Sequence, residues 1–324
     1  MANRPFRFGL QAFSGTSAKD WLSTARSAED HGYSTLFSSD HYFGPGAISD
    51  ATGHRAVDLA PLTSIAVAAA LTTSLRVGCR VFSCDFHHPV VLAKEMATLD
   101  LLSEGRLEVG LGAGWMKDEY DGLGVPMERP GVRIAKVEEY VALMRAHWSG
   151  QQIDQHGAYV QVTGFSGLPT PVQKPGPPIL IGGGAPKILG LAGRVADIVS
   201  LNFNNASGKL DSKSIFSSGA AETEQKLQWI RDGAGARYDD IEIEIGAYFV
   251  AVGDNASAQL DAMATRFGVT SDQFDSHPHA LFGSVERICD TLQERRERFG
   301  VNYVTVAQRY LDEFAPVVAA LAGR

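Results

Sequence analysis

Short apolar segments alternate with longer segments of helix length along the first third of the chain. Apolar runs of strand length occur at four places, residues 6–13, 34–39, 75–84 and 106–112. Segments long enough for helices lie between them, at residues 18–31, 59–73 and 89–103. In the first of these, Trp21, Leu22, Ala25 and Ala28 fall on one face at helical spacing. This alternation predicts a parallel sheet covered on both faces by helices.

The second part of the chain continues the alternation less regularly. Four more strands are predicted, at residues 177–184, 196–203, 241–252 and 301–307. Helices are predicted at residues 131–149, 185–193, 219–235, 255–268 and 284–299, and after 310. The polar stretch 149–171 predicts a hairpin or excursion, and 204–219 predicts a mobile loop. Eight strands favour a single (β/α)8 TIM barrel with insertion segments over residues 1–324, although an open sheet of similar order also fits the pattern.

Composition narrows the class of protein. The 324 residues carry a formal net charge of −8, which argues against non-specific binding to nucleic acid or to acidic membranes. No apolar run is long enough to span a bilayer, and the first residues lack the apolar segment of a secretion signal. Cys79, Cys84 and Cys289 do not form a disulfide framework, and we expect Cys79 and Cys84 to be buried thiols. We therefore expect a cytoplasmic protein with no nucleic-acid or membrane partner.

Polar side chains follow the second predicted strand. In STLFSSDHYFGP, the residues Ser38, Ser39, Asp40 and His41 come directly after the apolar run. They could simply cap the following loop, but the neighbouring strands also end in polar or glycine-rich stretches. These stretches are residues 11–14, 79–85, 112–115, 182–184 and 202–205. Because the active site of a (β/α)8 barrel lies at the carboxyl ends of its strands, the sequence predicts a site at this end.

The stretch LIGGGAPKILG predicts an anion site. Gly182, Gly183 and Gly184 end a predicted strand just before a helix begins. Backbone amides in such a turn can approach a ligand closely, and the amino terminus of a helix favours negative charge. A dinucleotide-binding fingerprint fits poorly, because Lys187 stands where a further glycine is required. A phosphate or another anion is therefore the predicted ligand of this turn.

Two other patterns suggest different chemistry. Asp40 and Asp85 could form the carboxylate pair of a metal-independent hydrolase, but the sequence does not fix their separation. His277 and His279 have a spacing seen in metal ligands, in a polar loop without an acidic partner pattern. We expect no metal site.

Taken together, these segments resemble the luciferase-like monooxygenase superfamily. The resemblance rests on AEDHGYSTLFSSDHY, on HPVVLAKEMATLDLLSEGRLEVGLGAGWMKDEYDGLG and on PPILIGGG, which occur in the family's order. Within the superfamily, the chain is most similar to the branch that uses the deazaflavin coenzyme F420. The resemblance implies a (β/α)8 barrel, often dimeric, with the isoalloxazine or deazaflavin ring at the carboxyl ends of the strands and the phosphate tail on glycine-rich loops.

The resemblance also assigns residues. Asp40 and His41 match a Ser-Asp-His element beside the redox ring, where the aspartate would hydrogen-bond the ring system and the histidine would be an acid or base. VGCRVFS matches the strand that carries a non-prolyl cis peptide, which by position would fall at Cys79–Arg80. The implied catalytic residues are Asp40 and His41. The implied cofactor-binding residues are Ser39, Asp40, Cys79, Arg80, Gly112, Ala113, Gly114, Trp115, Gly182, Gly183 and Gly184.

Departures from the family limit what can be transferred. The sugar-phosphate dehydrogenases of this branch carry a glutamate where this chain has Trp115, and a tryptophan where this chain has YFGP. Their catalytic acid and substrate clamp are missing here, so their activity is not transferred. Residues 44–61 contain no family motif, and we expect this segment on the substrate side, with His54 and Arg55 as candidate contacts.

The resulting hypothesis is an F420-dependent oxidoreductase. It would transfer a hydride between carbon five of the deazaflavin and a small organic substrate, with Asp40 and His41 orienting the ring and managing a proton. Three alternatives remain: an FMN-dependent monooxygenase that uses O2 and a partner reductase, a flavin- or deazaflavin-binding protein without turnover, and the hydrolase described above. The resemblance also implies a homodimer.

Overall fold

Eight parallel strands close into a barrel in the computed structural model, which describes residues 4–206, 208 and 212–324. In order around the barrel the strands are β1 (Arg7–Gln11), β2 (Thr35–Ser38), β3 (Arg76–Ser83), β4 (Leu107–Gly112), β7 (Ile179–Gly183), β8 (Ile198–Leu201), β9 (Glu242–Ala247) and β12 (Val301–Ala307). Pairing of β12 with β1 closes the sheet. The predicted (β/α)8 barrel is confirmed, and every strand of the barrel lies within a predicted strand segment.

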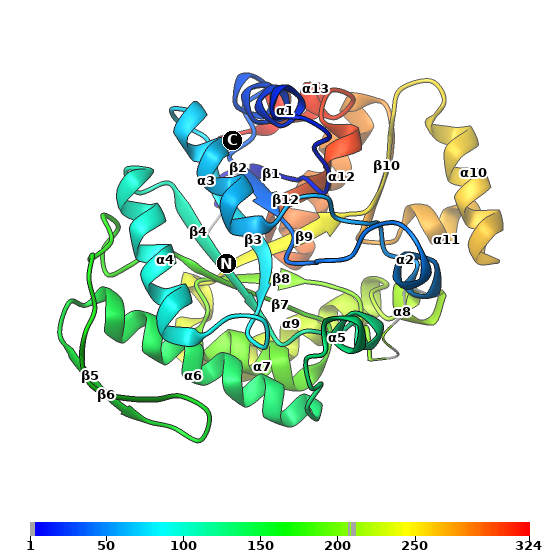
Figure 1. Cartoon of the computed structure of the whole chain (residues 1–324). Coiled ribbons are helices and arrows are strands. Elements are labelled where there is room, and N and C mark those ends of the chain that lie inside the picture. Colours follow the sequence, from blue (N-terminus) through cyan, green and yellow to red (C-terminus); the bar gives the residue numbers. More distant parts are fainter. Residues whose placement is uncertain (1–3, 207, 209–211) are drawn as a thin grey trace.

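Helices cover the outside of the barrel (Figure 1). The covering helices are α1 (Ala18–Asp30), α3 (Pro61–Leu71), α4 (Pro89–Leu102), α6 (Pro130–Trp148), α7 (Pro186–Val195), α9 (Ala220–Ala234), α12 (Val285–Phe299) and α13 (Ala315–Leu321). Their first residues follow local chemistry. The Ser17 side chain accepts a hydrogen bond from the Asp20 amide at 3.1 Å and caps α1. Proline occupies the first turn of α3, α4, α6 and α7, where its missing N–H costs no helical hydrogen bond.

Insertions decorate this barrel. The predicted excursion at 149–171 is an antiparallel hairpin, β5 (Gln152–His156) with β6 (Gln161–Ser166), which extends away from the barrel in Figure 1. The remaining elements are α2 (Ala47–Thr52), α5 (Lys117–Leu123), α8 (Ser212–Phe216), β10 (Phe249–Val252), α10 (Ala256–Phe267), α11 (Ser271–Asp275), β11 (Ala280–Gly283) and two 3-10 turns (Gly235–Asp240 and Gln308–Tyr310). In the predicted loop 204–219, α8 is helical, and residues 207 and 209–211 lie outside the described residues.

The prediction of one strand over residues 241–252 was wrong. The barrel strand ends at Ala247, and β10 instead pairs in parallel with β11 in a separate two-stranded sheet. The apolar pattern runs unbroken through both strands, so it does not show that the second one packs elsewhere. Phe249 lies against Phe267 and Phe274, with ring centroids 5.7 and 5.0 Å away, and forms part of a small second core beneath α10 and α11.

A buried carboxylate ties the amino ends of the barrel strands together. Glu108 on β4 is fully buried and accepts hydrogen bonds from Arg76 Nε at 2.9 Å and from the Tyr303 hydroxyl at 3.1 Å. It also forms an ion pair with Arg7 and accepts a bond from Thr35 Oγ1. Burial alone would raise the pKa of Glu108, but the charges of Arg7 and Arg76 outweigh it and hold this pKa below its usual range.

We expect Glu108→Gln to lower the free energy of unfolding by about 3 kcal/mol, because it removes the charge that compensates two arginines. Since the folded-state pKa is depressed, the stabilisation is present above the pKa of an unfolded carboxyl group and disappears as the pH falls. Urea denaturation at several pH values measures both effects. The control Glu138→Gln breaks an exposed pair with Arg194 and should cost less than about 1 kcal/mol. Equal losses in the two variants would contradict the assigned role of Glu108.

Candidate functional site

Asp40 and His87 form a carboxylate–imidazole pair at the carboxyl end of the barrel. The Asp40 side chain follows β2 and is completely buried. Its Oδ2 accepts a hydrogen bond from the Ser83 amide at 2.7 Å and lies 2.9 Å from His87 Nε2. Tyr42 also hydrogen-bonds this carboxylate, and burial together with the Asp40 charge raises the pKa of the Tyr42 phenol. Asp40 therefore holds the loops after β2 and β3 together.

His41 and Glu119 form a second pair beside the first. His41 Nδ1 lies 2.6 Å from Oε2 of Glu119, and the Tyr42 amide donates to Oε1 of the same carboxylate at 2.7 Å. Glu119 is on α5, in the loop after β4, and is buried. The His41 side chain is 15% exposed, so its ring reaches the surface of the site while its partner does not.

Aromatic side chains surround His41. The ring of His54 lies 4.5 Å from that of His41, and Trp115 and Phe43 lie 6.2 and 5.7 Å away. His54 Nδ1 is 2.7 Å from the carbonyl oxygen of Arg55. Burial, and secondarily the charge of His41, lowers the pKa of His54 to about 3, so this imidazole is neutral at pH 7. The structure thus places the predicted substrate residue His54 against the predicted catalytic histidine, while Arg55 is exposed.

Ser39 and Arg80 belong to a buried network inside the barrel. The Gln11 side chain donates to Ser39 Oγ at 2.8 Å and to the Arg80 carbonyl at 3.0 Å. The Arg80 guanidinium donates to Gln11, to Ser200 at 3.0 Å and to Glu244 at 3.1 Å. Arg80 is 7% exposed. Burial alone would lower the pKa of its guanidinium, but the charge of Glu244 outweighs this effect and the pKa is raised. Ser39, Cys79 and Arg80 lie beneath the surface of the site.

The non-prolyl cis peptide lies between Arg80 and Val81, one bond later than the predicted Cys79–Arg80 bond. The sequence identifies the strand, but the register of β3 against β4 shifts between Cys79 and Phe82, and the pattern does not show which bond in this irregular stretch is cis. At this point the Val81 side chain enters the barrel and packs with Phe37, Leu180 and other buried residues.

Packing within the chain explains most of the predicted cofactor glycines. A Cβ atom would meet Val81 at Gly112, the Tyr120 hydroxyl at Gly114, Ile188 at Gly183 and the Phe203 carbonyl at Gly184. Gly182 is different, because its nearest neighbour would be Val81 Cγ1 at 3.6 Å, an ordinary contact distance. A methyl group at position 182 would therefore fit in ordinary contact with Val81 and Ser200.

Other predicted candidates have structural partners. Asp85 binds Lys136 Nζ at 2.8 Å and the Tyr120 hydroxyl at 2.9 Å. His277 and His279 are buried rather than in a polar loop, and their imidazoles lie 3.0 and 2.7 Å from the carbonyl oxygens of Ile215 and Gly246. Within residues 4–206, 208 and 212–324, no three His, Cys, Asp or Glu side chains form a cluster suited to a metal ion. Burial raises the pKa of both the Cys79 and the Cys84 thiols, as expected for inert cysteines.

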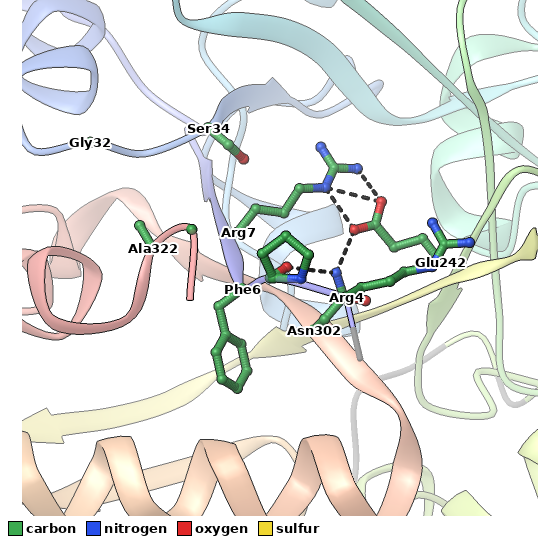
Figure 2. A pocket seen from close by; sticks show the side chains of 10 residues that line it. Arg4, Phe6, Arg7, Gly32, Ser34, Glu242, Asn302 and Ala322 are labelled. Atoms are coloured by element: carbon green, nitrogen blue, oxygen red, sulfur yellow. Dashed lines mark hydrogen bonds and ion pairs between the residues drawn. The ribbon is translucent and has the colours of Figure 1, made fainter. Parts of the chain in front are cut away.

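A pocket at the opposite end of the barrel does not belong to this site. Figure 2 shows Arg7 and Glu242 at the amino ends of β1 and β9, joined by hydrogen bonds beside Asn302. This pocket of about 450 Å³ is lined by the first strand and the last residues of the chain, among them Phe6 and Ala322. Arg7 and Glu242 are paired with each other, and the pocket lies away from the carboxyl ends where barrel enzymes bind their substrates.

Sequence reasoning missed His87 and Glu119. His87 stands two residues before Pro89, where α4 begins, and the pattern does not show that the loop after β3 turns back onto Asp40. Glu119 lies in a segment without a strong pattern of its own. The stretch GWMKDEYDGLG, quoted for its resemblance, did contain it. Both residues become visible only when neighbouring strand ends are brought together.

The sequence profile of luciferase-like monooxygenases matches residues 4–317. The chain belongs to this family. An uncharacterised protein of Mycobacterium tuberculosis is 35% identical over 187 residues, which span 54% of this chain and 64% of that protein. An F420-dependent glucose-6-phosphate dehydrogenase of Nakamurella multipartita is 30% identical over 247 residues, which span 75% of this chain and 67% of the enzyme. An FMNH2-dependent dimethylsulfone monooxygenase of Pseudomonas putida is 26% identical over 163 residues, 50% and 41% of the two chains.

The fold is shared with solved structures. The coenzyme F420-dependent tetrahydromethanopterin reductase of Methanopyrus kandleri superposes with a TM-score of 0.76 over 98% of both chains, at 18% identity. This likeness shows the fold alone. The named relatives of this luciferase-like chain are oxidoreductases and monooxygenases, so a flavin or deazaflavin coenzyme is supported. No described helix has the length and apolar character that crossing a membrane requires.

The difference between Gly182 and Gly184, two positions apart on the chain, gives a test. Gly182→Ala should fold normally but weaken coenzyme binding about tenfold, a change of about 1.4 kcal/mol, because the methyl group fits in ordinary contact with Val81 and Ser200 but narrows the partly exposed end of β7. Gly184→Ala should instead lower the unfolding free energy by about 1–3 kcal/mol, since its methyl group overlaps the Phe203 carbonyl. Thermal denaturation and coenzyme titration of both variants measure these effects. Unchanged binding by Gly182→Ala would remove position 182 from the coenzyme site.

Proposed function

We propose that this luciferase-like protein is an F420-dependent oxidoreductase that transfers a hydride between the deazaflavin and a small organic substrate. The observation that carries the proposal is the placement of His41. Its partly exposed imidazole is fixed at the carboxyl end of β2 by the buried carboxylate of Glu119. The Ser39, Asp40 and His41 sequence, which resembles the F420 branch, supports the deazaflavin. So does the Nakamurella enzyme, which aligns with three quarters of the chain.

The residues present fit a flat redox ring with a phosphate-bearing tail. Gly182 and Val81 are both partly exposed, and Val81 offers an apolar surface beside the glycine. Gly183, at the end of β7 before α7, and Ala113 and Gly114 after β4 expose backbone at the same end of the barrel. In this proposal these residues hold the coenzyme. When bound, the coenzyme accepts or supplies a hydride.

The buried residues of the site would act by positioning neighbouring groups. Asp40 has no exposed carboxylate surface, so we infer that it orients His87 and the Ser83 amide rather than contacting the ring directly. Arg80 and Gln11 support the strand ends from below. His41 and His87, whose side chains are 15% and 17% exposed, are the titratable groups of the two pairs that can reach a ligand.

An FMN-dependent monooxygenase is the second candidate. It is favoured by the relative that is an FMNH2-dependent dimethylsulfone monooxygenase. Such an enzyme would need a partner reductase and O2. Three points stay predictions: a small organic substrate, the alternative that the protein binds the coenzyme without turnover, and the homodimer implied by the resemblance.

Parallel titration with F420 and FMN decides between the two coenzymes. We expect the cofactor-free protein to bind F420 at least about tenfold more tightly than FMN, a difference of about 1.4 kcal/mol, as measured by fluorescence quenching. Preference for FMN would contradict the proposal and make oxygen consumption the next assay. Failure to bind either would reject both candidates and return attention to the hydrolase alternative with Asp40 and Asp85.

Asp40→Asn tests the supporting role of the first pair. The substitution keeps the size of the side chain but places an amide donor against the His87 and Ser83 donors. We expect coenzyme binding to weaken about tenfold, by about 1.4 kcal/mol, and stability to fall by about 1–3 kcal/mol. The matched control is Asp50→Asn, at an exposed position of α2. A variant of Asp40 that binds the coenzyme like the wild type would show that this pair does not shape the site.

A further inference from the structure

The His41 ring is held at one nitrogen only. Nδ1 is 2.6 Å from Glu119 Oε2, and no described residue hydrogen-bonds to Nε2. An ionised carboxylate can accept hydrogen bonds but cannot donate them. The contact with an ionised Glu119 therefore requires a proton on Nδ1. In the neutral imidazole, Nε2 is then left with a free lone pair.

Glu119 is itself fixed in place. Its second oxygen, Oε1, accepts the Tyr42 amide at 2.7 Å, and the whole residue is 2% exposed. The carboxylate thus binds two successive residues of the loop after β2, the His41 ring and the Tyr42 backbone. It has no freedom to rotate without breaking one of these bonds, which makes the orientation of the His41 ring a property of the fold.

The surroundings of His41 restrict the ring further. His54 faces it at a centroid distance of 4.5 Å, while Phe43 and Trp115 meet it edge-on at 5.7 and 6.2 Å. None of these neighbours is a second carboxylate, and Asp40, the adjacent acid, is engaged by His87. Glu119 is the acidic side chain that contacts His41 among the described residues.

We propose that Glu119 is the positioning residue of this site, fixing His41 as the Nδ1-protonated tautomer so that Nε2 exchanges the substrate proton. This inference rests on the proposed function and deepens it. In the oxidative direction the substrate O–H bond breaks and its proton passes to Nε2, while the C–H bond releases a hydride to the oxidised coenzyme. In the reductive direction Nε2 returns the proton to the carbonyl oxygen, and the hydride comes from the reduced coenzyme. Glu119 stays ionised and stabilises the imidazolium in either direction.

The geometry of the His41–Glu119 pair suits this proton step. A histidine with a fixed tautomer, partly exposed and backed by a buried carboxylate, is a competent general acid and base. The substrate class that follows is an alcohol, or the matching carbonyl compound, small enough to reach Nε2 between the aromatic rings.

Long-range 1H–15N NMR of the coenzyme-free protein tests the tautomer directly, without a substrate. At a pH where the ring is neutral, as shown by the 15N shifts across a pH series, we expect His41 of the wild type to show a protonated Nδ1 and an unprotonated Nε2. Glu119→Asp should keep this pattern, and Glu119→Ala should give a mixture of the two tautomers. Asp121→Asn is the control, because Asp121 lies on the same helix but makes an exposed pair with Lys117. A neutral wild-type ring protonated at Nε2, or a Glu119→Ala variant whose neutral ring keeps the wild-type tautomer, would overturn the proposal.

F420 titration of the same samples separates the two proposals. Glu119→Ala should bind the coenzyme within about threefold of the wild type, because Glu119 acts on the proton and not on the ring. On an alcohol substrate its kcat should fall about 100-fold with KM little changed, and Glu119→Asp should recover part of the loss. If the wild type binds no F420, the proposed function fails, while the NMR result still decides the role of Glu119. If the alanine variant folds poorly, the wild-type spectrum alone still tests which nitrogen of His41 carries the proton.

Discussion

Closure of the barrel is the constraint on which the rest of the structure depends. Pairing of β1 with β12 brings residues near the two ends of the chain into register, with Gln11 opposite Ala307. It also places the carboxyl ends of all eight strands around one rim, so side chains from distant parts of the sequence meet there. Asp40, His87 and Glu119 come from the loops after β2, β3 and β4. These three loops meet because β2, β3 and β4 are neighbours in the sheet.

Charged layers at two heights hold the closed barrel. Near the amino ends, Glu108 joins Arg7, Arg76 and Tyr303 from three other strands. Nearer the carboxyl ends, the Arg80 guanidinium donates hydrogen bonds to Gln11, Ser200 and Glu244. Buried ion pairs are costly to desolvate, and such pairs fix specific geometry more than they add stability. Here the upper layer lies directly beneath the site, so strand positions at the rim are set by hydrogen bonds rather than by packing alone.

The sequence predicted the barrel well because strand and helix periodicity is local. It failed where an apolar segment continued but changed its partner, as at β10, which pairs with β11 outside the barrel. It placed Asp40 and His41 at the rim, since both directly follow a strand. It could not find their partners, because His87 and Glu119 meet them only through the fold. It also could not separate Gly182 from Gly184, whose different surroundings depend on Val81 and Phe203.

The two carboxylate–imidazole pairs look alike in composition but are oriented differently. In the first pair the buried member, Asp40, belongs to the strand end, and its histidine comes from the next loop. In the second pair the strand end supplies the histidine, and the buried acid comes from a helix. Asp40 is therefore held by a histidine of one loop, and His41 by a carboxylate of another. These two contacts prevent the turn that contains both residues from rotating as a unit. A luciferase-like barrel can change the chemistry at its rim by changing these partners while the strands below stay the same, and this is why family membership alone does not name the substrate.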